Sequence, residues 1–267
     1  MGDRVHGLVH PENSNCENAI RGRGNLSTEI DMPGHTMFGG NAQYVSRPEH
    51  YWVHLPDNVS FEQAAAGSWS YPTSHRIIVD RCQVKIGDIV LITGLSGGMG
   101  NAALQWAKLA GARVIGTTRN HDKKADLLTM GADFVVVTED IEQAQSDILK
   151  HTSGRGVNHF IEFTGNSELI ALPKTVLALG GTVCQVGGDV YSDHIPYTVF
   201  DLTRKEMQIV GIRGSRRIDQ ITYLEQLSAG KITVPIACEM PLSEIQEAHR
   251  MVENSQVTGK ILINPWG

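Results

Sequence analysis

The stretch Ile89-Val90-Leu91-Ile92-Thr93-Gly94-Leu95-Ser96-Gly97-Gly98-Met99-Gly100 decides the fold of this chain. Its first part, Ile89–Thr93, is a continuous apolar run of the kind that forms a strand buried on both faces. After the glycines, Asn101–Ala110 has the length and pattern of a helix that Gly111 ends. A second apolar run, Arg113–Thr117, follows the helix where the next strand of a strand–helix–strand unit is expected. The chain therefore contains a strand, a glycine turn, a helix and a second, parallel strand.

The alternation of apolar strands and amphipathic helices continues toward the carboxyl terminus. It predicts strands at Phe134–Val137, His159–Phe163, Thr182–Val186, Met207–Ile212 and Lys260–Ile263. Between and after them it predicts helices at Lys123–Met130 and Ile141–His151, one ending near Gly180, and two more at Gln220–Ala229 and Ser243–Glu253. The first sixty residues show only short β-like runs, at Tyr44–Val45 and Tyr51–His54. This pattern predicts an α/β fold with a Rossmann-type, doubly wound parallel sheet.

The glycine turn between the first strand and its helix has the features of a phosphate-binding site. Gly94 permits a tight turn, Gly97 allows the backbone to approach a pyrophosphate, and Gly100 allows the helix to pack closely on the strand. Unpaired N–H groups at the start of the helix would bind the phosphates. We therefore expect Gly94, Ser96, Gly97, Gly98, Met99 and Gly100 to bind a dinucleotide. The alternative is an ordinary glycine-rich connection.

The end of the second strand indicates which dinucleotide binds. An NAD site usually has Asp or Glu there for the ribose hydroxyls, whereas this chain has Thr118. Arg119 can donate to a ribose 2'-phosphate, and Lys123 or Lys124 adds positive charge. The sequence therefore predicts NADP(H) as the cofactor. The alternative is that these three cations form a solvated helix start.

Composition excludes several other classes of function. The chain has 267 residues, a formal net charge of −6 and 41% hydrophobic residues, which do not favour nucleic acid or an anionic membrane surface as a partner. Its four cysteines form no close pair, and no apolar run approaches a membrane span. We therefore expect a cytoplasmic protein that acts on a small-molecule substrate.

Several motifs resemble those of the medium-chain dehydrogenase/reductase superfamily, which includes zinc alcohol dehydrogenases, quinone reductases and enoyl-CoA reductases. Gly2-Asp3-Arg4-Val5 is similar to its G-D-R-V, and residues 39–45 to its G-G-x-A-E-Y-V. Residues 94–100 resemble the G-x-S-G-G-x-G of its NADPH-dependent members. The resemblance implies a partial GroES-like catalytic domain at residues 1–70, a Rossmann domain at 71–210, and a return to the catalytic domain at 211–267.

The resemblance also implies departures from the zinc enzymes. In the family, several tens of residues precede the G-D-R-V element, so this sequence is either a fragment or a naturally shortened member. The structural-zinc positions correspond to Asn13, Cys16, Ala19 and Ser27, and the third catalytic ligand to Trp69. We therefore expect no metal. The alternative is a makeshift site built from His6, His10, Cys16 or His35; otherwise the three histidines are expected to be exposed loop residues.

Further site residues follow from the same resemblance. Thr164 and Gly165 after one strand, and Val186, Gly187 and Gly188 after another, correspond to loops that pass the pyrophosphate and nicotinamide; the alternative is two ordinary turns. Thr73 is expected near the nicotinamide, while Trp69 shapes the cleft or belongs to the core. Tyr71, Thr73 and His75 are weak candidates for the catalytic residue, chosen by their place in the sequence alone.

Three functions fit these observations. The first is zinc-independent, NADPH-dependent reduction of an activated double bond in a quinone, an enone or an enoyl thioester. The second is an alcohol dehydrogenase-like protein whose amino-terminal half is missing. The third is an NADP(H)-binding protein without turnover. An incomplete β domain would leave strand edges uncovered, so we also expect a homo-oligomer. Arg216 and Arg217 either meet an anionic substrate or form a solvated surface pair.

Overall fold

The computed structural model describes residues 2–188, 194–254 and 257–267. It divides the chain into two compact units, one formed by Met1–Thr73 with Arg213–Gly267 and the other by Ser74–Ile212. The division falls inside helix α3 (Ser70–Arg76). The domain limits at residues 70 and 210, and the GroES-like character of the flanking segments, remain predictions.

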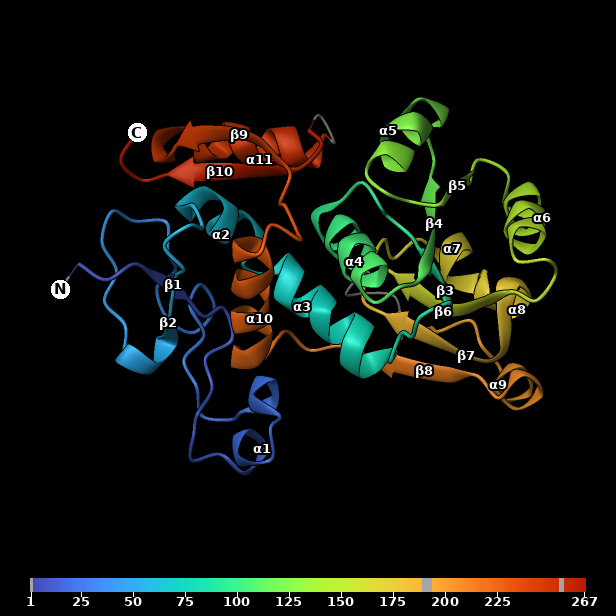
Figure 1. Cartoon of the computed structure of the whole chain (residues 1–267), viewed down its shortest axis with the longest axis horizontal. Helices are drawn as coiled ribbons and strands as arrows, with labels where there is room; N and C mark the ends of the chain where they lie inside the picture. Colours follow the sequence, from blue (N-terminus) through green and yellow to red (C-terminus); the bar gives the residue numbers. More distant parts are fainter. Residues whose placement is uncertain (1, 189–193, 255–256) are drawn as a thin grey trace. The chain divides into compact units, whose positions relative to one another are not determined.

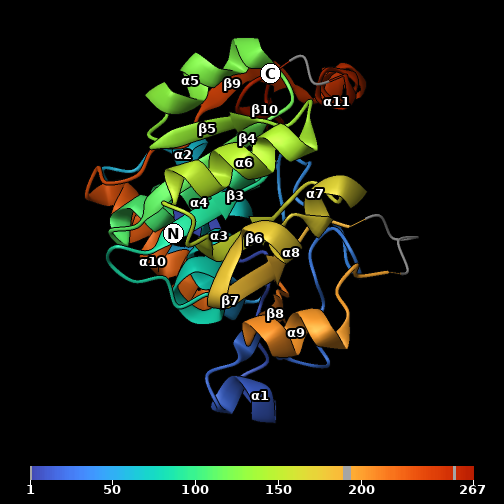
Figure 2. The ribbon, with the colours of Figure 1, turned by 90° about the vertical axis from the view of Figure 1, so that its right-hand side faces the viewer.

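The unit Ser74–Ile212 is built on one parallel sheet in the order β5-β4-β3-β6-β7-β8. Figure 2 shows these strands side by side, with β5 at one edge and β8 at the other. Its strands are β3 (Ile89–Ile92), β4 (Arg113–Thr118), β5 (Phe134–Val137), β6 (Val157–Glu162), β7 (Leu177–Gln185) and β8 (Gln208–Gly211). This arrangement confirms the predicted α/β fold with a doubly wound, Rossmann-type sheet.

Helices cover both faces of this sheet (Figure 1). Helix α4 (Gly98–Leu109) packs on β3 and β4, and it buries Leu104 and Trp106. On the other face, Ile148 of α6 and Val176 of α8 enter a core with Leu91, whose side chain is fully buried. The helices of this unit are α4, α5 (Lys124–Thr129), α6 (Ile141–His151), α7 (Ser167–Ala171), α8 (Pro173–Val176) and α9 (Val199–Lys205). Burial on both faces explains why the strands are apolar throughout rather than alternating.

One predicted helix end in this unit is wrong. The helix expected to end near Gly180 is replaced by two short helices, α7 and α8, and the second ends at Val176. Gly180 lies instead inside strand β7. A glycine at this place in the sequence predicts a helix end, but Gly180 has a positive φ of 72° within the strand, next to a register shift between β6 and β7.

The other unit contains two small sheets. Strands β1 (Val5–Gly7) and β2 (Trp52–His54) are antiparallel, and β9 (Ile236–Pro241) and β10 (Lys260–Asn264) are parallel. Its helices include α1 (Glu17–Ile20), α2 (Phe61–Gly67), α10 (Arg217–Ser228) and α11 (Ile245–Glu253). The expected β-like run at Tyr44–Val45 is wrong, because no strand forms there, and the tyrosine side chain is 80% exposed. Strand β9 was not predicted.

Across residues 2–188, 194–254 and 257–267, no helix is both long enough and apolar enough to cross a bilayer.

Candidate nucleotide-binding site

The carboxyl edge of the parallel sheet carries four loops that follow adjacent strands. They come after β4, β3, β6 and β7, which are neighbours in that order. The chain moves to one side of β3 to form β4 and β5, and to the other side to form β6, β7 and β8. The strand order therefore reverses at β3 and β6, and such a reversal opens a crevice where nucleotides bind in open α/β sheets.

The loop after β3 is a tight turn that only glycine can form at two positions. Gly94 has a φ of 64°, and a Cβ at Gly100 would lie 2.2 Å from the Gly94 carbonyl oxygen. The N–H of Gly97 donates to that same carbonyl at 3.0 Å. Helix α4 can therefore begin directly on the turn, with its first backbone segment against the end of β3.

The amino terminus of α4 is open to a ligand. Its N-cap is Gly97, which has no side chain to cap the helix, and no side-chain cap hydrogen bond forms. The first N–H groups of a helix have no partner within the helix and carry a partial positive charge. Gly97 is exposed, and Gly98 and Met99 are half-buried, so these groups are within reach of an anion.

The loop after β4 presents Arg119. Thr118 Oγ1 accepts from the Asn120 N–H at 3.1 Å and donates to the Asn120 carbonyl at 3.2 Å, which fixes the backbone on both sides of the arginine. Arg119 is exposed, and within the described part of the chain its guanidinium makes no hydrogen bond or ion pair. Lys123, at the end of the short 3-10 turn that follows, is half-buried. The guanidinium is thus available to a phosphate.

The loops after β6 and β7 contact one another through glycines. A Cβ at Gly187 would lie 2.4 Å from the carbonyl carbon of Phe163, and one at Gly165 would lie 3.1 Å from Gly188. A Cβ at Gly94 would approach Thr164 Cγ2 to 3.1 Å, so the turn after β3 joins the same group. The structure therefore brings together three of the predicted loops.

A buried glutamate that the sequence analysis missed ties these loops together. Glu162, fully buried at the end of β6, accepts from Thr93 Oγ1 at 3.0 Å and from the N–H groups of Thr164 and Gly165 at 2.8 and 2.9 Å. It also accepts from Gln185 Nε2 at 3.1 Å and from the Thr164 hydroxyl. A signal was available, because a carboxylate inside an apolar strand must find hydrogen-bond donors.

Tyr197 lies in the electrostatic field of this glutamate. Burial, and secondarily the charge of Glu162, raise the pKa of the Tyr197 phenol well above its usual value. Its hydroxyl donates to the Ile170 carbonyl. Tyr197 therefore stays protonated at neutral pH and holds helix α7.

The three weak catalytic candidates are placed differently. Tyr71 is buried, stacks on Tyr223 and donates its hydroxyl hydrogen to the Thr233 carbonyl at 2.9 Å, as a core residue would. His75 packs edge-on against Trp106 of α4, with 4.7 Å between ring centroids. Thr73 is buried at the boundary of the two units, and its hydroxyl has no hydrogen-bond partner among the described residues. His75 lies in the unit that carries the parallel sheet, whereas Tyr71 and Thr73 belong to the other unit.

Comparison with known proteins identifies the family. Residues 98–229 match the family model described as zinc-binding dehydrogenase. Human quinone oxidoreductase is 30% identical over 235 residues, which cover 85% of this chain and 70% of the relative. The chain belongs to the medium-chain dehydrogenase/reductase superfamily. It is therefore related to nicotinamide-dependent oxidoreductases, and the predicted family is confirmed.

Solved structures of the superfamily agree with the fold. An NAD-dependent alcohol dehydrogenase superposes with a TM-score of 0.88 at 29% identity, covering 98% of this chain and 76% of the other. The 2-octenoyl-CoA carboxylase reductase CinF, in complex with NADP and 2-octenoyl-CoA, gives a TM-score of 0.84 at 28% identity, covering 98% and 62%. The superfamily thus includes proteins described with either nucleotide.

The described residues offer few side chains that could ligate a zinc ion like that of many medium-chain dehydrogenases. Within residues 2–188, 194–254 and 257–267, no three His, Cys, Asp or Glu side chains are grouped as a metal site requires. Asn13 donates to the Thr28 carbonyl at 3.4 Å, and Cys16 Sγ lies 3.7 Å from Thr28 Oγ1. Hydrogen bonds, first of all from the Thr28 backbone, lower the pKa of the Cys16 thiol to about 7. One thiol and an amide do not make a structural-zinc lobe.

The expected exposure of two histidines is wrong. His6 and His10 are buried, with 7% and 5% of their surfaces exposed, whereas His35 is exposed as expected. His6 Nε2 lies 3.3 Å from Gln220 Oε1, and the His10 ring packs on Trp69 at 4.9 Å. Both are packing residues of the first unit that the sequence pattern did not reveal.

The structure also shows the surroundings of Trp69, Arg216 and Arg217. Trp69 is 41% exposed, so it is not a core residue. Arg216 pairs with Asp219 through two hydrogen bonds of 2.9 Å, and Arg217 donates to the carbonyls of His50 and Trp52 at 2.9 Å. Both arginines are half-buried and structural, which corrects the interpretation of a solvated surface pair.

Proposed function

We propose that this oxidoreductase binds NADP(H) at the carboxyl edge of its sheet and reduces an activated double bond without zinc. The observation that carries the proposal is the pairing of an uncapped helix terminus at Gly97 with an unengaged guanidinium at Arg119 on the adjacent strand end. The first fits a pyrophosphate and the second a 2'-phosphate.

The residues of this chain fit the nucleotide in three places. Gly94, Ser96, Gly97, Gly98, Met99 and Gly100 would hold the pyrophosphate, Thr118, Arg119 and Lys123 the 2'-phosphate ribose, and Thr164, Gly165, Val186, Gly187 and Gly188 the nicotinamide half. The close approach of Gly165 to Gly188, and of Gly187 to Phe163, leaves no room for a Cβ at Gly165 or Gly187. Glu162 accepts hydrogen bonds from this group of loops and would keep them in place.

When bound, the cofactor supplies a hydride, and reduction of the acceptor is completed by a proton. Conjugated acceptors fit a site without a metal, because the developing negative charge spreads to an oxygen that hydrogen-bond donors can stabilise. Quinones and enoyl thioesters belong to this class, and the relatives named quinone oxidoreductase and 2-octenoyl-CoA carboxylase reductase support it. Hydrogen-bond donors placed around that oxygen would thus take the role that the metal ion has as a Lewis acid in the zinc alcohol dehydrogenases.

Titration of the purified chain with NADPH and NADH, followed by nucleotide fluorescence, tests the cofactor. Loss of a charge-assisted hydrogen bond costs about 1.5–3 kcal/mol, so Arg119→Ala should raise the Kd for NADPH about 10- to 100-fold. The Kd for NADH should change less than about twofold, because NADH has no 2'-phosphate. Arg155→Ala, a change at another exposed arginine of the same unit, is the matched control and should bind NADPH like the wild type. Equal losses for both nucleotides would contradict the proposed role.

A panel of acceptors then tests the reaction. Oxidation of NADPH by a quinone, an enone or an enoyl thioester, with no dependence on added Zn²⁺ and no inhibition by a chelator, is the expected result. Turnover restricted to alcohols or aldehydes and restored by Zn²⁺ would favour the alcohol dehydrogenase alternative. Tight NADPH binding with no oxidation by any acceptor would favour a binding protein without turnover.

A further inference from the structure

A cavity of about 430 Å³ lies in the unit formed by Met1–Thr73 and Arg213–Gly267. Residues of β1 and β2 and of the segment between them line it, and all the lining residues belong to this unit. The cavity is therefore distinct from the glycine turn of the parallel sheet. Its volume is in the range of cavities that hold small molecules.

Trp52 of β2 forms an aromatic wall of this cavity. It pairs with Gly7 of β1, and a Cβ at Gly7 would lie 3.3 Å from Trp52 Cζ3. The absence of a side chain at Gly7 therefore lets the indole approach the backbone of β1 closely. The tryptophan is half-buried, so part of the ring is left to a ligand. An indole packs well against another flat ring.

The other side chains that define the cavity are mainly aliphatic. Val45 is 41% exposed although it is apolar. Removal of such a surface from water favours the binding of an apolar molecule. The aliphatic lining residues are Leu8, Val9, Pro33, Ala42 and Val45.

Arg47 is the cation of the lining, and its guanidinium is already engaged. Nη1 donates to the Ser46 carbonyl at 3.0 Å, and Nη2 donates to the Gly39 carbonyl at 3.0 Å and to the Phe38 carbonyl. These bonds hold the backbone that carries Ala42 and Val45. Among the described residues that line the cavity, no charged group is therefore left without a partner, and an uncharged ligand fits best.

Two neutral groups of the lining remain available. Within the described part of the chain, the amide of Gln43 and the hydroxyl of Ser68 make no hydrogen bond. The Tyr51 hydroxyl, in contrast, donates to the Asp31 carbonyl at 3.0 Å. An amide NH₂ group and a hydroxyl can both donate to a carbonyl oxygen. The lining thus offers a large apolar surface and a few donors, which is typical of small-molecule sites.

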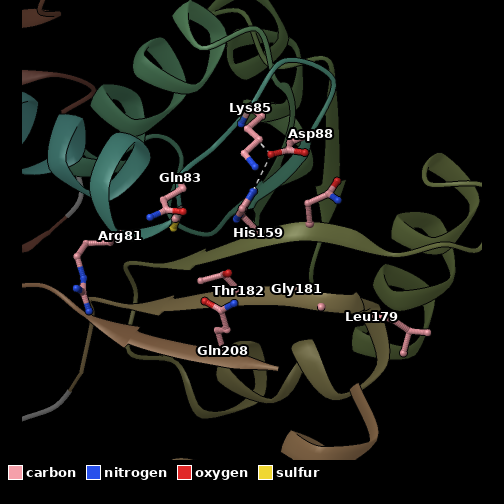
Figure 3. A pocket seen from close by; sticks show the side chains of 12 residues that line it. Arg81, Gln83, Lys85, Asp88, His159, Leu179, Gly181, Thr182 and Gln208 are labelled. Carbon is pink, nitrogen blue, oxygen red and sulfur yellow. Dashed lines mark hydrogen bonds and ion pairs between the residues drawn. The ribbon is translucent and has the colours of Figure 1, made fainter. Parts of the chain in front are cut away.

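Another cavity, in the unit Ser74–Ile212, has a different lining (Figure 3). Its side chains include Arg81, Lys85 and the pair Asp88 and His159, in which Oδ2 and Nε2 are 2.9 Å apart. An apolar ring gains little from contact with such polar groups. This second cavity therefore serves as an internal reference for the first.

We propose that the cavity beside Trp52 binds an uncharged, flat ring compound that carries a carbonyl oxygen. The ring packs against the Trp52 indole and the aliphatic side chains, and Gln43 and Ser68 donate to the oxygen. The proposal concerns binding alone and requires neither NADP(H) nor turnover.

Titration of the ¹⁵N-labelled chain with coumarin, an uncharged bicyclic ring with one carbonyl group, tests the proposal. The indole N–H of Trp52 and the backbone N–H of Gly40 report on this cavity, and the backbone N–H of Gly181 reports on the reference cavity. Saturable shifts at Trp52 and Gly40, with none at Gly181, are expected. The anion coumarin-3-carboxylate should bind at least tenfold more weakly, because no free cation compensates its charge.

Two pairs of variants test the lining. Val45→Asp should raise the coumarin Kd at least tenfold, because the bound ring would remove the carboxylate from water. Val5→Asp changes a valine that is also 41% exposed but does not line the cavity, and it should leave the Kd unchanged. Gln43→Ala removes one donor and should raise the Kd about 2- to 10-fold, whereas Asn41→Ala, at an exposed position nearby, should not.

Four results would each overturn the proposal. They are shifts that do not saturate, shifts at Gly181 equal to those at Trp52, equal weakening by Val45→Asp and Val5→Asp, and binding of the anion as tightly as coumarin. A coumarin Kd that rises with protein concentration would also overturn it, since a second copy of the chain would then occupy the cavity.

Discussion

Glu162 is the residue that most clearly links sequence to a working site. Its carboxylate is fully buried at the end of β6, where hydrogen bonds from Thr93, Thr164, Gly165 and Gln185 stabilise it. Each donor comes from the end of β3, β6 or β7 or from the loop that follows it. A carboxylate that accepts several hydrogen bonds is stable in a buried place, but it becomes costly when any donor is lost. The Glu162 carboxylate therefore helps to hold these loops in position.

Glu162→Gln should destabilise the chain and weaken nucleotide binding together. The amide replaces one acceptor oxygen by an NH₂ group that faces other donors, at an expected cost of about 2–4 kcal/mol. Urea unfolding should show that loss, and the Kd for NADPH should rise about tenfold because the loops after β6 and β7 are no longer fixed.

Glu168→Gln is the control for this prediction. Glu168 lies in the first turn of α7 and is exposed. Its side chain makes no hydrogen bond or ion pair within the described residues. It should change neither measurement. If Glu162→Gln leaves both the unfolding free energy and the NADPH Kd at wild-type values, Glu162 does not organise the loops.

At the scale of single residues, the sequence predicts the glycines of the turn better than it predicts the residues that support the loops. Gly94 and Gly100 are recognisable because their spacing reflects a backbone geometry that is local to one turn. Glu162 is not, since its donors Thr93 and Gln185 are distant in sequence and meet it only through the order of the strands. For the same reason, the sequence does not predict that the Tyr71 hydroxyl donates to the carbonyl of Thr233, 162 residues away.

At the scale of elements, strand β7 shows why some boundaries were wrong. A glycine after an amphipathic run predicts a helix end, but Gly180 continues the strand. The end of α8 is set by Lys205, whose Nζ donates to the carbonyls of Pro173, Thr175 and Leu177 at 3.3, 3.4 and 2.7 Å. That contact joins residues about 30 positions apart, so no local pattern predicts it. The apolar strands β3 and β5 depend on burial alone and were predicted closely.

Helix α9 offers a test of backbone strain at an element end. Its C-cap, Glu206, has a φ of 50° and a ψ of 42°, a left-handed conformation usually occupied by glycine. Glu206→Gly should raise the free energy of unfolding by about 0.5–1 kcal/mol, because relief of the strain exceeds the added entropy of the unfolded chain. Glu206→Ala keeps a Cβ and should give no such gain. Urea unfolding of the two variants would contradict the argument if they were equally stable.

At the scale of the whole molecule, we expect acid stability to depend on a buried histidine of the unit that does not carry the parallel sheet. His6 is 7% exposed in the unit formed by Met1–Thr73 and Arg213–Gly267, and burial lowers the pKa of its imidazole from 6.5 to about 4, opposed in part by the hydrogen bond with Gln220. The folded chain therefore holds His6 neutral at pH values where the unfolded chain is protonated.

The direction of the resulting pH dependence follows from proton linkage. Between about pH 4 and pH 6.5 the unfolded chain binds more protons at His6 than the folded chain, so stability is complete above pH 6.5 and falls as the pH decreases toward 4. At 1.36 kcal/mol per pH unit, the window corresponds to about 3 kcal/mol. His6→Gln has no imidazole to protonate, so it should lose less stability than the wild type between pH 7 and pH 4.5.

Urea unfolding followed by tryptophan fluorescence measures this difference, because Trp52, Trp69 and Trp266, three of the four tryptophans, lie in the same unit as His6. The comparison with His35→Gln, at an exposed position of that unit, corrects for the other groups that titrate in this range. The wild type and His35→Gln should lose stability in parallel on acidification, while His6→Gln retains about 2–3 kcal/mol more of it. Parallel losses in all three proteins would mean that His6 becomes charged in the folded state without cost, and the acid sensitivity would then have to arise from carboxylates elsewhere in the chain.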